Sequence, residues 1–223
     1  VKAFGVDEKT AEKIHPVWHG GWEHLVHEIE SGEDNCTEEL AALGHYLLYV
    51  GTNRKHKNIS NLLHAFKLAM NSIPAEKKLA IIGSEKYLKP ADLATIHEIN
   101  AHGKRVIFTG YLSQACVDKY FEHADAFIFP SLSEGFGLGV IEAFYYHIPL
   151  LCSDITSLPE IAGEAALYFN PFEPTDIAAA ITNFYTDETI APKLIAAGKE
   201  RLALYSWKKN AAATVDFYQQ CLG

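Results

Sequence analysis

Six short apolar runs, separated by stretches with helical periodicity, set the strongest limit on what this chain can fold into. Consecutive runs lie too far apart to pair as hairpins, so each connection must be a crossover and the strands must be parallel. Strands that are apolar throughout are buried on both faces, which requires helices on both sides. The sequence therefore predicts an α/β fold: a Rossmann-like parallel sheet of about six strands with helices on both faces. The expected strands are Tyr46 to Val50, Leu79 to Ile82, Val106 to Thr109, Ala126 to Phe129, Leu150 to Cys152 and Ala166 to Phe169.

The stretches between and after these runs predict the helices. Residues 58 to 73 place Leu62, Phe66 and Met70 on one face, and Pro74 ends the pattern. Near the end of the chain, Ser206 is suited to cap a helix. The other expected helices are Trp22 to Glu30, Glu38 to Leu43, Pro90 to His102, Gln114 to His123, Leu138 to Tyr146, Pro174 to Thr186, Thr189 to Leu204 and Trp207 to Cys221.

Composition narrows the class of partner. With 223 residues, 48% of them hydrophobic, the chain can bury about 70% of its unfolded surface. A net charge of −9 argues against binding duplex nucleic acid, which needs clustered basic residues, so we expect a small-molecule partner. The eleven histidines are dispersed, so neither a metal site nor a resident cofactor is expected. The four cysteines have no CxxC spacing and the sequence has no long apolar span, so a reducing, cytoplasmic setting is the default expectation.

The fourth expected strand runs into a glycine-rich loop. Pro130 stops the strand, because proline cannot donate to the sheet, and a helix is expected from Leu138. Between them, the glycines at 135, 137 and 139 remove three side chains within five residues. A ligand could therefore approach the main chain closely.

This loop has the features of an anion site bracketed by two acids. The amides of Phe136, Gly137 and Leu138 would lie at the positive end of the helix, where an anion binds well. Glu134 precedes the glycines and would face the crevice above the sheet, whereas Glu142 would reach in from the helix.

A basic turn follows the first expected strand. Residues 51 to 58 read GTNRKHKN and carry Arg54, Lys55 and Lys57 just before a helix. Side-chain charge and the helix dipole would both attract a diphosphate there, and arginine can grip two oxygens at once. The alternative for Arg54 is a side chain that points to solvent.

The spacing of Glu134 and Glu142, with Gly-Phe-Gly-Leu-Gly between them, resembles the E-x7-E motif of retaining glycosyltransferases of the GT-B fold, family 4. The resemblance implies that the first acid, Glu134, lies by the hydroxyls of the donor sugar, and that Gly135 to Leu138 contact the sugar and diphosphate. The second acid, Glu142, would bind the ribose. Arg54 and Lys57 would stabilise the leaving diphosphate, which makes Arg54, Lys57 and Glu134 the expected catalytic residues.

The resemblance also assigns residues in other turns to donor binding. Gly51 and Thr52 would lie at the diphosphate, although many family members carry an arginine where this chain has Thr52. Gly83 belongs to a small-residue turn near the nucleotide, and Gly110, Tyr111 and Leu112 would flank the base. The segment from Ser157 to Gly163 is expected to support the loop by packing rather than to take part in chemistry.

The resemblance further predicts how the chain is organised. Residues 1–44 would be the tail of an N-terminal domain and linker helices, residues 45–205 the nucleotide-sugar-binding domain, and residues 206–223 a helix that crosses back. The expected donor is a UDP- or GDP-sugar that acts as substrate, without metal. An acceptor saccharide or lipid-linked glycan would be held by the N-terminal domain, so the fragment alone is expected to be inactive. The expected location is cytoplasmic, with peripheral association at the inner membrane face left open.

Two other functions stay open at this point. A nicotinamide oxidoreductase would need G-x-G-x-x-G after the first strand, whereas this chain has GTNRKH there. A non-catalytic nucleotide-binding or interaction domain of the same fold is the stronger alternative, because the same pockets could serve it.

Overall fold

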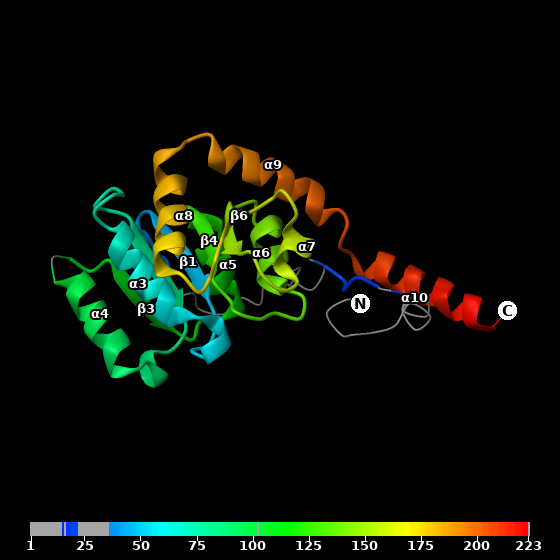
Figure 1. Cartoon of the computed structure of the whole chain (residues 1–223), viewed down its shortest axis with the longest axis horizontal. Helices are drawn as coiled ribbons and strands as arrows, with labels where there is room; N and C mark the ends of the chain where they lie inside the picture. Colours follow the sequence, from blue (N-terminus) through cyan, green and yellow to red (C-terminus); the bar gives the residue numbers. More distant parts are fainter. Residues whose placement is uncertain (1–14, 16, 22–35, 102, 223) are drawn as a thin grey trace.

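The structure, a computed structural model, describes residues 15, 17–21, 36–101 and 103–222. Its centre is one parallel sheet of six strands in the order β3-β2-β1-β4-β5-β6. The strands are β1 (Tyr46–Val50), β2 (Lys78–Ile82), β3 (Val106–Gly110), β4 (Ala126–Phe129), β5 (Leu150–Ser153) and β6 (Leu167–Phe169). The predicted fold class is confirmed (Figure 1).

Helices cover both faces of the sheet because successive strand residues point to opposite sides. Leu47 and Tyr49 of β1 pack with the helices of one face, and Tyr46 and Leu48 pack with those of the other. The first face is covered by α3 (Ile59–Ala69), α4 (Pro90–Asn100) and α8 (Pro174–Thr186); the second is covered by α2 (Thr37–Leu43), α5 (Gln114–His123), α6 (Leu138–Tyr145) and α7 (Leu158–Ala162).

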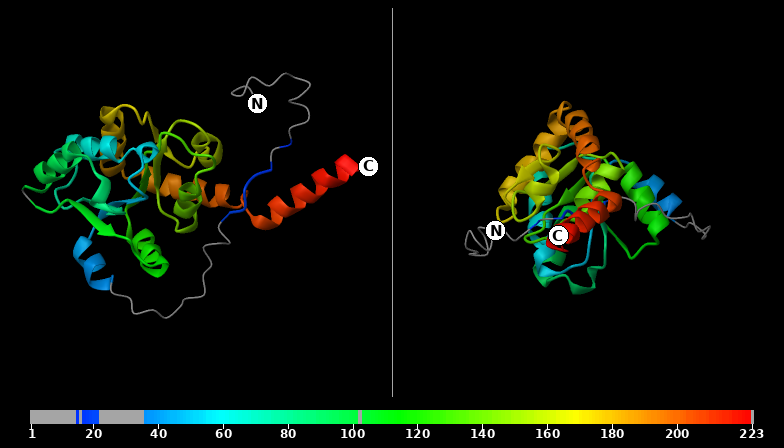
Figure 2. Two further views of the ribbon diagram at one scale, coloured as in Figure 1. Left: turned by 90° about the horizontal axis from the view of Figure 1, so that it is seen from below. Right: turned by 90° about the vertical axis from the view of Figure 1, so that its right-hand side faces the viewer.

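The last two helices lead away from the sheet. Helix α9 (Ile190–Leu202) packs on α6, where Gly198 lies against the ring of Phe144. Helix α10 (Trp207–Leu222) then extends away from the rest of the domain, as Figure 1 and the left view of Figure 2 show. Ser206 begins it as predicted, since its hydroxyl accepts a hydrogen bond from the Lys209 amide at 3.1 Å. Within the described ranges, no helix is long and apolar enough to cross a membrane.

The observed elements differ from the predicted ones mainly at their ends. Helix α3 stops at Ala69, and Ile73 is buried beyond its end, so an apolar residue at helical spacing extended the prediction too far. The short helices α7, η3 (Lys55–Lys57) and η4 (Glu85–Tyr87) were not predicted, because they are too short to show a periodic pattern. The helix expected over 22–30 lies outside the described residues, and the division of the chain at 44 and 205 stays a prediction.

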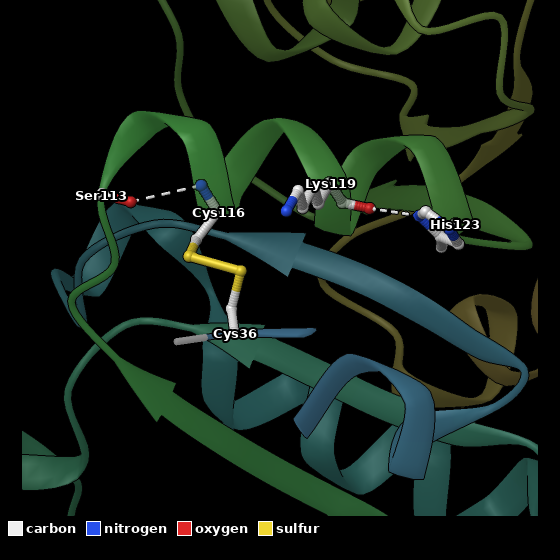
Figure 3. Close-up of a disulfide and its surroundings, with 5 residues drawn as sticks. All are labelled: Cys36, Ser113, Cys116, Lys119 and His123. Carbon is white, nitrogen blue, oxygen red and sulfur yellow. Dashed lines mark hydrogen bonds between the residues drawn. A yellow bond between two sulfur atoms is a disulfide. The ribbon is translucent and has the colours of Figure 1, made fainter. Parts of the chain in front are cut away.

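The structure pairs two cysteines that the sequence pattern did not predict to pair. Cys36 and Cys116 form a disulfide that joins the segment before α2 to the first turn of α5 (Figure 3). The two residues are 80 positions apart in the sequence, and their Cα atoms lie 6.0 Å apart. Sequence spacing gave no sign of the pair because only the fold brings the two elements together. Cys152 is a buried free thiol and Cys221 an exposed one.

Candidate active site

The strand order reverses between β1 and β4, and the functional turns meet there. Ligands of open parallel sheets bind above the carboxyl ends of the strands at such a reversal. The basic turn from Gly51 to Asn58 follows β1, and the glycine-rich loop from Pro130 to Gly137 follows β4. Strand pairing of β1 with β4 therefore brings the two predicted halves of the site to one edge, as expected.

Hydrogen bonds fasten the basic turn to the ends of neighbouring strands. Asn58 is buried, and its side-chain amide donates to the carbonyls of Pro130, at 3.0 Å, and Pro171, at 2.7 Å. The amide of Leu132 also donates to the carbonyl of His56, at 2.7 Å. Asn58 has a φ of 60°, in the left-handed region that asparagine tolerates better than most residues. The turn is thus fixed between the segments that follow β4 and β6.

Lys57 and Glu134 form an ion pair across the site. The ammonium of Lys57 donates to Oε1 of Glu134 at 2.7 Å, and the two side chains are only 21% and 15% exposed. The same ammonium lies 5.2 Å from the centre of the Phe129 ring. Burial, reinforced by the Glu134 carboxylate, raises the pKa of the Tyr49 hydroxyl. This ion pair therefore places one cation and one anion in a mostly buried setting.

Of the glycines at positions 135, 137 and 139, two are required by the structure. Gly137 has a φ of 98°, and a β-carbon there would lie 2.7 Å from Leu158. A β-carbon on Gly139 would lie 3.0 Å from the ring of Phe127. Gly135 has open space around it, so neither its backbone nor its packing requires glycine. Gly137 caps the start of α6, which leaves the first amides of that helix without carbonyl partners inside it.

The segment that contains α7 supports the loop, as predicted. Oγ of Ser157 lies 3.1 Å from the carbonyl oxygens of both Glu134 and Phe136. The amide of Glu134 donates to Oγ1 of Thr156 at 3.4 Å. These contacts set the direction in which the Glu134 side chain leaves the loop.

A pocket of about 390 Å³ brings together six of the predicted site residues. These six are Lys57, Glu134, Phe136, Gly137, Leu138 and Glu142, and Val50, Phe127, Phe129 and Gly139 also line the pocket. We call it the donor pocket. The structure thus brings together both acids, the lysine and the start of α6.

His19 is a pocket residue that the sequence analysis did not identify. Its ring lies 5.2 Å from that of Phe136 and 4.7 Å from that of Trp207, measured between centroids. Its Nδ1–H donates to the carbonyl of Gly20 at 2.7 Å, which leaves Nε2 as the other polar atom of the ring. No local pattern marks His19, because it reaches the pocket from a segment more than one hundred residues before the loop.

The remaining predicted residues lie beside the donor pocket rather than in its lining. A β-carbon on Gly83 would lie 2.4 Å from the carbonyl oxygen of Gly51, and Gly83 forms an isolated bridge with Gly110. These glycines allow the ends of β1, β2 and β3 to approach closely. Thr52 is exposed, Leu112 is partly buried, and Tyr111 is 76% exposed at the same edge. Arg54 lines a different pocket, on another side of the basic turn.

Among the described residues, no group of three or more His, Cys, Asp or Glu side chains is arranged to hold a metal ion. The expectation that the site works without metal stays a prediction.

Comparison with known proteins now gives the family. The family described as "Glycosyl transferases group 1" matches residues 40–201, which is most of the chain. The chain belongs to this family.

The chain is 29% identical over 177 residues to O-antigen chain mannosyltransferase B of Escherichia coli, covering 78% of this chain and 45% of that protein. It is 31% identical over 183 residues to the E. coli serotype-specific mannosyltransferase WbdA, covering 79% of this chain and 22% of that protein. The chain thus spans less than half the length of these relatives.

Solved structures agree with this assignment. Sucrose-phosphate synthase from Thermosynechococcus elongatus matches with a TM-score of 0.66 and 26% identity over 80% of this chain and 46% of that one. A UDP-forming trehalose-phosphate synthase from Burkholderia xenovorans has a TM-score of 0.72 at 13% identity, covering 94% of this chain and 52% of that one, and supports the fold alone. The chain is a glycosyltransferase domain whose parallel sheet is the one expected of the GT-B fold.

Proposed function

We propose that this domain binds a nucleotide diphosphate sugar and supplies the donor half of a retaining sugar transfer. The observation that supports this best is the Lys57–Glu134 ion pair, at 2.7 Å, beside the start of α6 in the donor pocket. A diphosphate needs a cation and free amides, and a sugar needs a carboxylate that accepts from its hydroxyls. The pocket offers all three within one space.

The chemistry follows from how charge moves in the reaction. As the bond from the sugar C1 to the diphosphate breaks, negative charge builds on the leaving oxygen. Lys57 and the first amides of α6 are fixed before the reaction, so they can stabilise that charge without rearranging. In this proposal the protein supplies the neutralising charge and no metal is required.

Other residues at the carboxyl edge of the sheet would bind the rest of the donor. Glu142 would accept from the ribose hydroxyls, since it lines the pocket from one turn inside α6. Gly110, Tyr111 and Leu112 would flank the base, and the exposed ring of Tyr111 is available to stack on it. Gly51, Thr52 and Gly83 would contact the diphosphate and nucleotide through their backbones. Arg54 could assist only by reaching across from its own pocket.

The sugar and the acceptor are proposed from the relatives. Both E. coli proteins are named as mannosyltransferases, which favours a hexose carried by UDP or GDP. The acceptor, a saccharide or lipid-linked glycan, would be held by a further domain of the full-length protein. We further propose the location predicted from the sequence, the cytoplasm at or near the inner membrane face. The Cys36–Cys116 disulfide is the observation that opposes this location, because disulfides are rare in the cytosol.

Calorimetry with nucleoside diphosphate and bare nucleoside tests the donor site directly. If Lys57 and the α6 amides hold the diphosphate, UDP or GDP should bind far more tightly than uridine or guanosine. Lys57→Ala should remove most of this preference, on the order of 1.5 to 3 kcal/mol for a hydrogen bond to a charged group. The preference should also shrink as salt rises, because the pocket is partly open to solvent.

Lys55→Ala is the matched control, since Lys55 lies two residues away in the same turn but outside the donor pocket. An unchanged diphosphate preference in Lys57→Ala, with a folded protein, would contradict the proposed role of the turn. Sugar transfer by a full-length Lys57→Ala variant at the normal rate would favour the non-catalytic alternative for this pocket.

A further inference from the structure

The basic turn from Gly51 to Asn58 presents its cations to two separate pockets. Lys57 lines the donor pocket, whereas Arg54 and Lys55 line a second pocket of about 500 Å³ together with Lys89, from the segment before α4. We call this second one the flanking pocket. Leu132, just after β4, also lies in its lining, and the two pockets share no lining residue.

The flanking pocket carries an excess of positive charge in an acidic chain. Arg54, Lys55 and Lys89 are all exposed, and none of the ion pairs between described residues includes any of them. Asp92 also lines the pocket, but it is only 3% exposed. Its Oδ2 accepts from the Ser60 hydroxyl at 3.0 Å and from the Lys89 amide at 3.2 Å. Asp92 is therefore occupied in holding α3 to α4, which leaves three cations facing one space.

One unsatisfied hydrogen-bond donor also supports an anion as the ligand of this pocket. The side-chain nitrogen of Asn53, a pocket residue, is buried and has no hydrogen-bond partner. A buried donor without a partner costs stability, so a ligand oxygen that accepted from it would recover that cost. The first residues of α3, an eleven-residue helix, also line the pocket and add the positive end of a helix dipole.

We infer that the flanking pocket binds a phosphate group, held by Arg54, Lys55, Lys89 and the Asn53 amide. A phosphate dianion has acceptor oxygens on every side, which matches a lining of three cations and a free amide. The space is larger than one phosphate, so the ligand class is inorganic phosphate or a small phosphate monoester. This site is distinct from the diphosphate site proposed for the donor pocket, and it does not depend on that proposal.

The test measures phosphate binding while the donor pocket is filled. Inorganic phosphate and glycerol 3-phosphate are titrated by calorimetry at low salt, with and without saturating nucleoside diphosphate. We expect both to bind in either condition. The double variant Lys55→Gln/Lys89→Gln should lose about tenfold or more in phosphate affinity, because two charge-assisted contacts are removed, yet keep its affinity for nucleoside diphosphate.

Three further variants sharpen the result. Lys193→Gln/Lys208→Gln makes the same change in net charge on α9 and α10 and should leave phosphate binding intact. Lys55→Arg/Lys89→Arg keeps the charge and should restore binding. Lys57→Ala should show the opposite pattern to Lys55→Gln/Lys89→Gln, with weakened nucleoside diphosphate and unchanged phosphate affinity. Melting temperatures of all variants verify that they are folded.

The outcomes separate the two proposals. Competition between phosphate and nucleoside diphosphate, or an equal loss of both in Lys55→Gln/Lys89→Gln, would assign the pocket to the donor site and overturn the inference. Absence of binding at millimolar phosphate would also overturn it. If the protein bound phosphate but no nucleoside diphosphate, the proposed function would fail and the flanking site would stand. Tighter binding of glycerol 3-phosphate than of phosphate would indicate that the pocket also contacts the attached group.

Discussion

At the scale of single residues, Lys57 and Glu134 illustrate a site whose two charges hold each other in place. They are 77 residues apart in the sequence, and the pair is largely enclosed. In the proposed complex their tasks differ, because the lysine contacts the diphosphate and the glutamate contacts the sugar. Removing one of them therefore affects two ligands differently.

Glu134→Ala should weaken binding of the nucleotide sugar but not of the bare nucleoside diphosphate. The lost contact to a sugar hydroxyl is a hydrogen bond to a charged group, on the order of 1.5 to 3 kcal/mol. Bare diphosphate should bind equally well or more tightly, since Lys57 no longer has to leave an internal partner. Calorimetry with both ligands measures the difference.

Glu142→Gln provides the contrast. Because Glu142 is proposed to bind the ribose, which both ligands carry, this substitution should weaken the binding of both by a similar factor. If Glu134→Ala reduced the affinity for both ligands equally, its assignment to the sugar would be wrong.

Sequence patterns identified the residues with local signatures and missed those placed by the fold. Glu134, Gly137 and Glu142 stand in one recognisable run, and they line one pocket. His19 reaches the same pocket from a distant segment, and Arg54 turns toward another pocket although it is three residues from Lys57. The direction of a side chain in a turn depends on backbone angles that residue spacing does not reveal.

At the scale of elements, Asn58 connects the basic turn to two strand ends. Its two side-chain hydrogen bonds are buried, and its backbone is left-handed. No local pattern singles it out, because its partners are backbone carbonyls more than seventy residues away. Predictions of elements succeeded where apolar periodicity was long, as in α3 and α8, and failed for three-to-five-residue helices such as α7.

Asn58→Ala should destabilise the domain by about 2 to 4 kcal/mol, because two buried hydrogen bonds are lost and alanine resists the left-handed conformation. Asn61→Ala is the matched control, since Asn61 donates only one such bond, to Pro171 at 3.0 Å, and should cost about 1 kcal/mol. Urea denaturation of the three proteins measures both values. Equal stabilities of Asn58→Ala and Asn61→Ala would show that Asn58 does not fasten the turn.

At the scale of the whole molecule, the sequence predicted that the strands are parallel but not their order. Spacing excludes hairpins, yet it does not reveal that β4 pairs with β1 rather than with β3. That pairing creates the reversal in strand order and places the two functional turns together. The Cys36–Cys116 disulfide likewise could not be predicted from sequence spacing, since it depends on where the segment before α2 meets α5.

The disulfide predicts how many cysteine thiols react with an alkylating reagent. Native protein should react at one thiol near pH 8, Cys221, because it is exposed. Cys152 should not react: it is buried, and burial, with a smaller contribution from Asp154, raises the pKa of its thiol, so the reactive thiolate is scarce. Denatured, unreduced protein should show two thiols, and reduced protein four. Mass spectrometry after alkylation counts them.

Reduction should also lower stability, because a cross-link between residues 80 positions apart restricts the unfolded chain, an effect of about 2 to 4 kcal/mol. Cys36→Ser should show the same loss in the absence of reductant, and its melting temperature should no longer respond to reductant. Four thiols in the denatured, unreduced protein would mean that Cys36 and Cys116 stay reduced, as the expectation of a reducing compartment requires. Two thiols would instead favour an oxidising setting, because disulfides are rare in the cytosol.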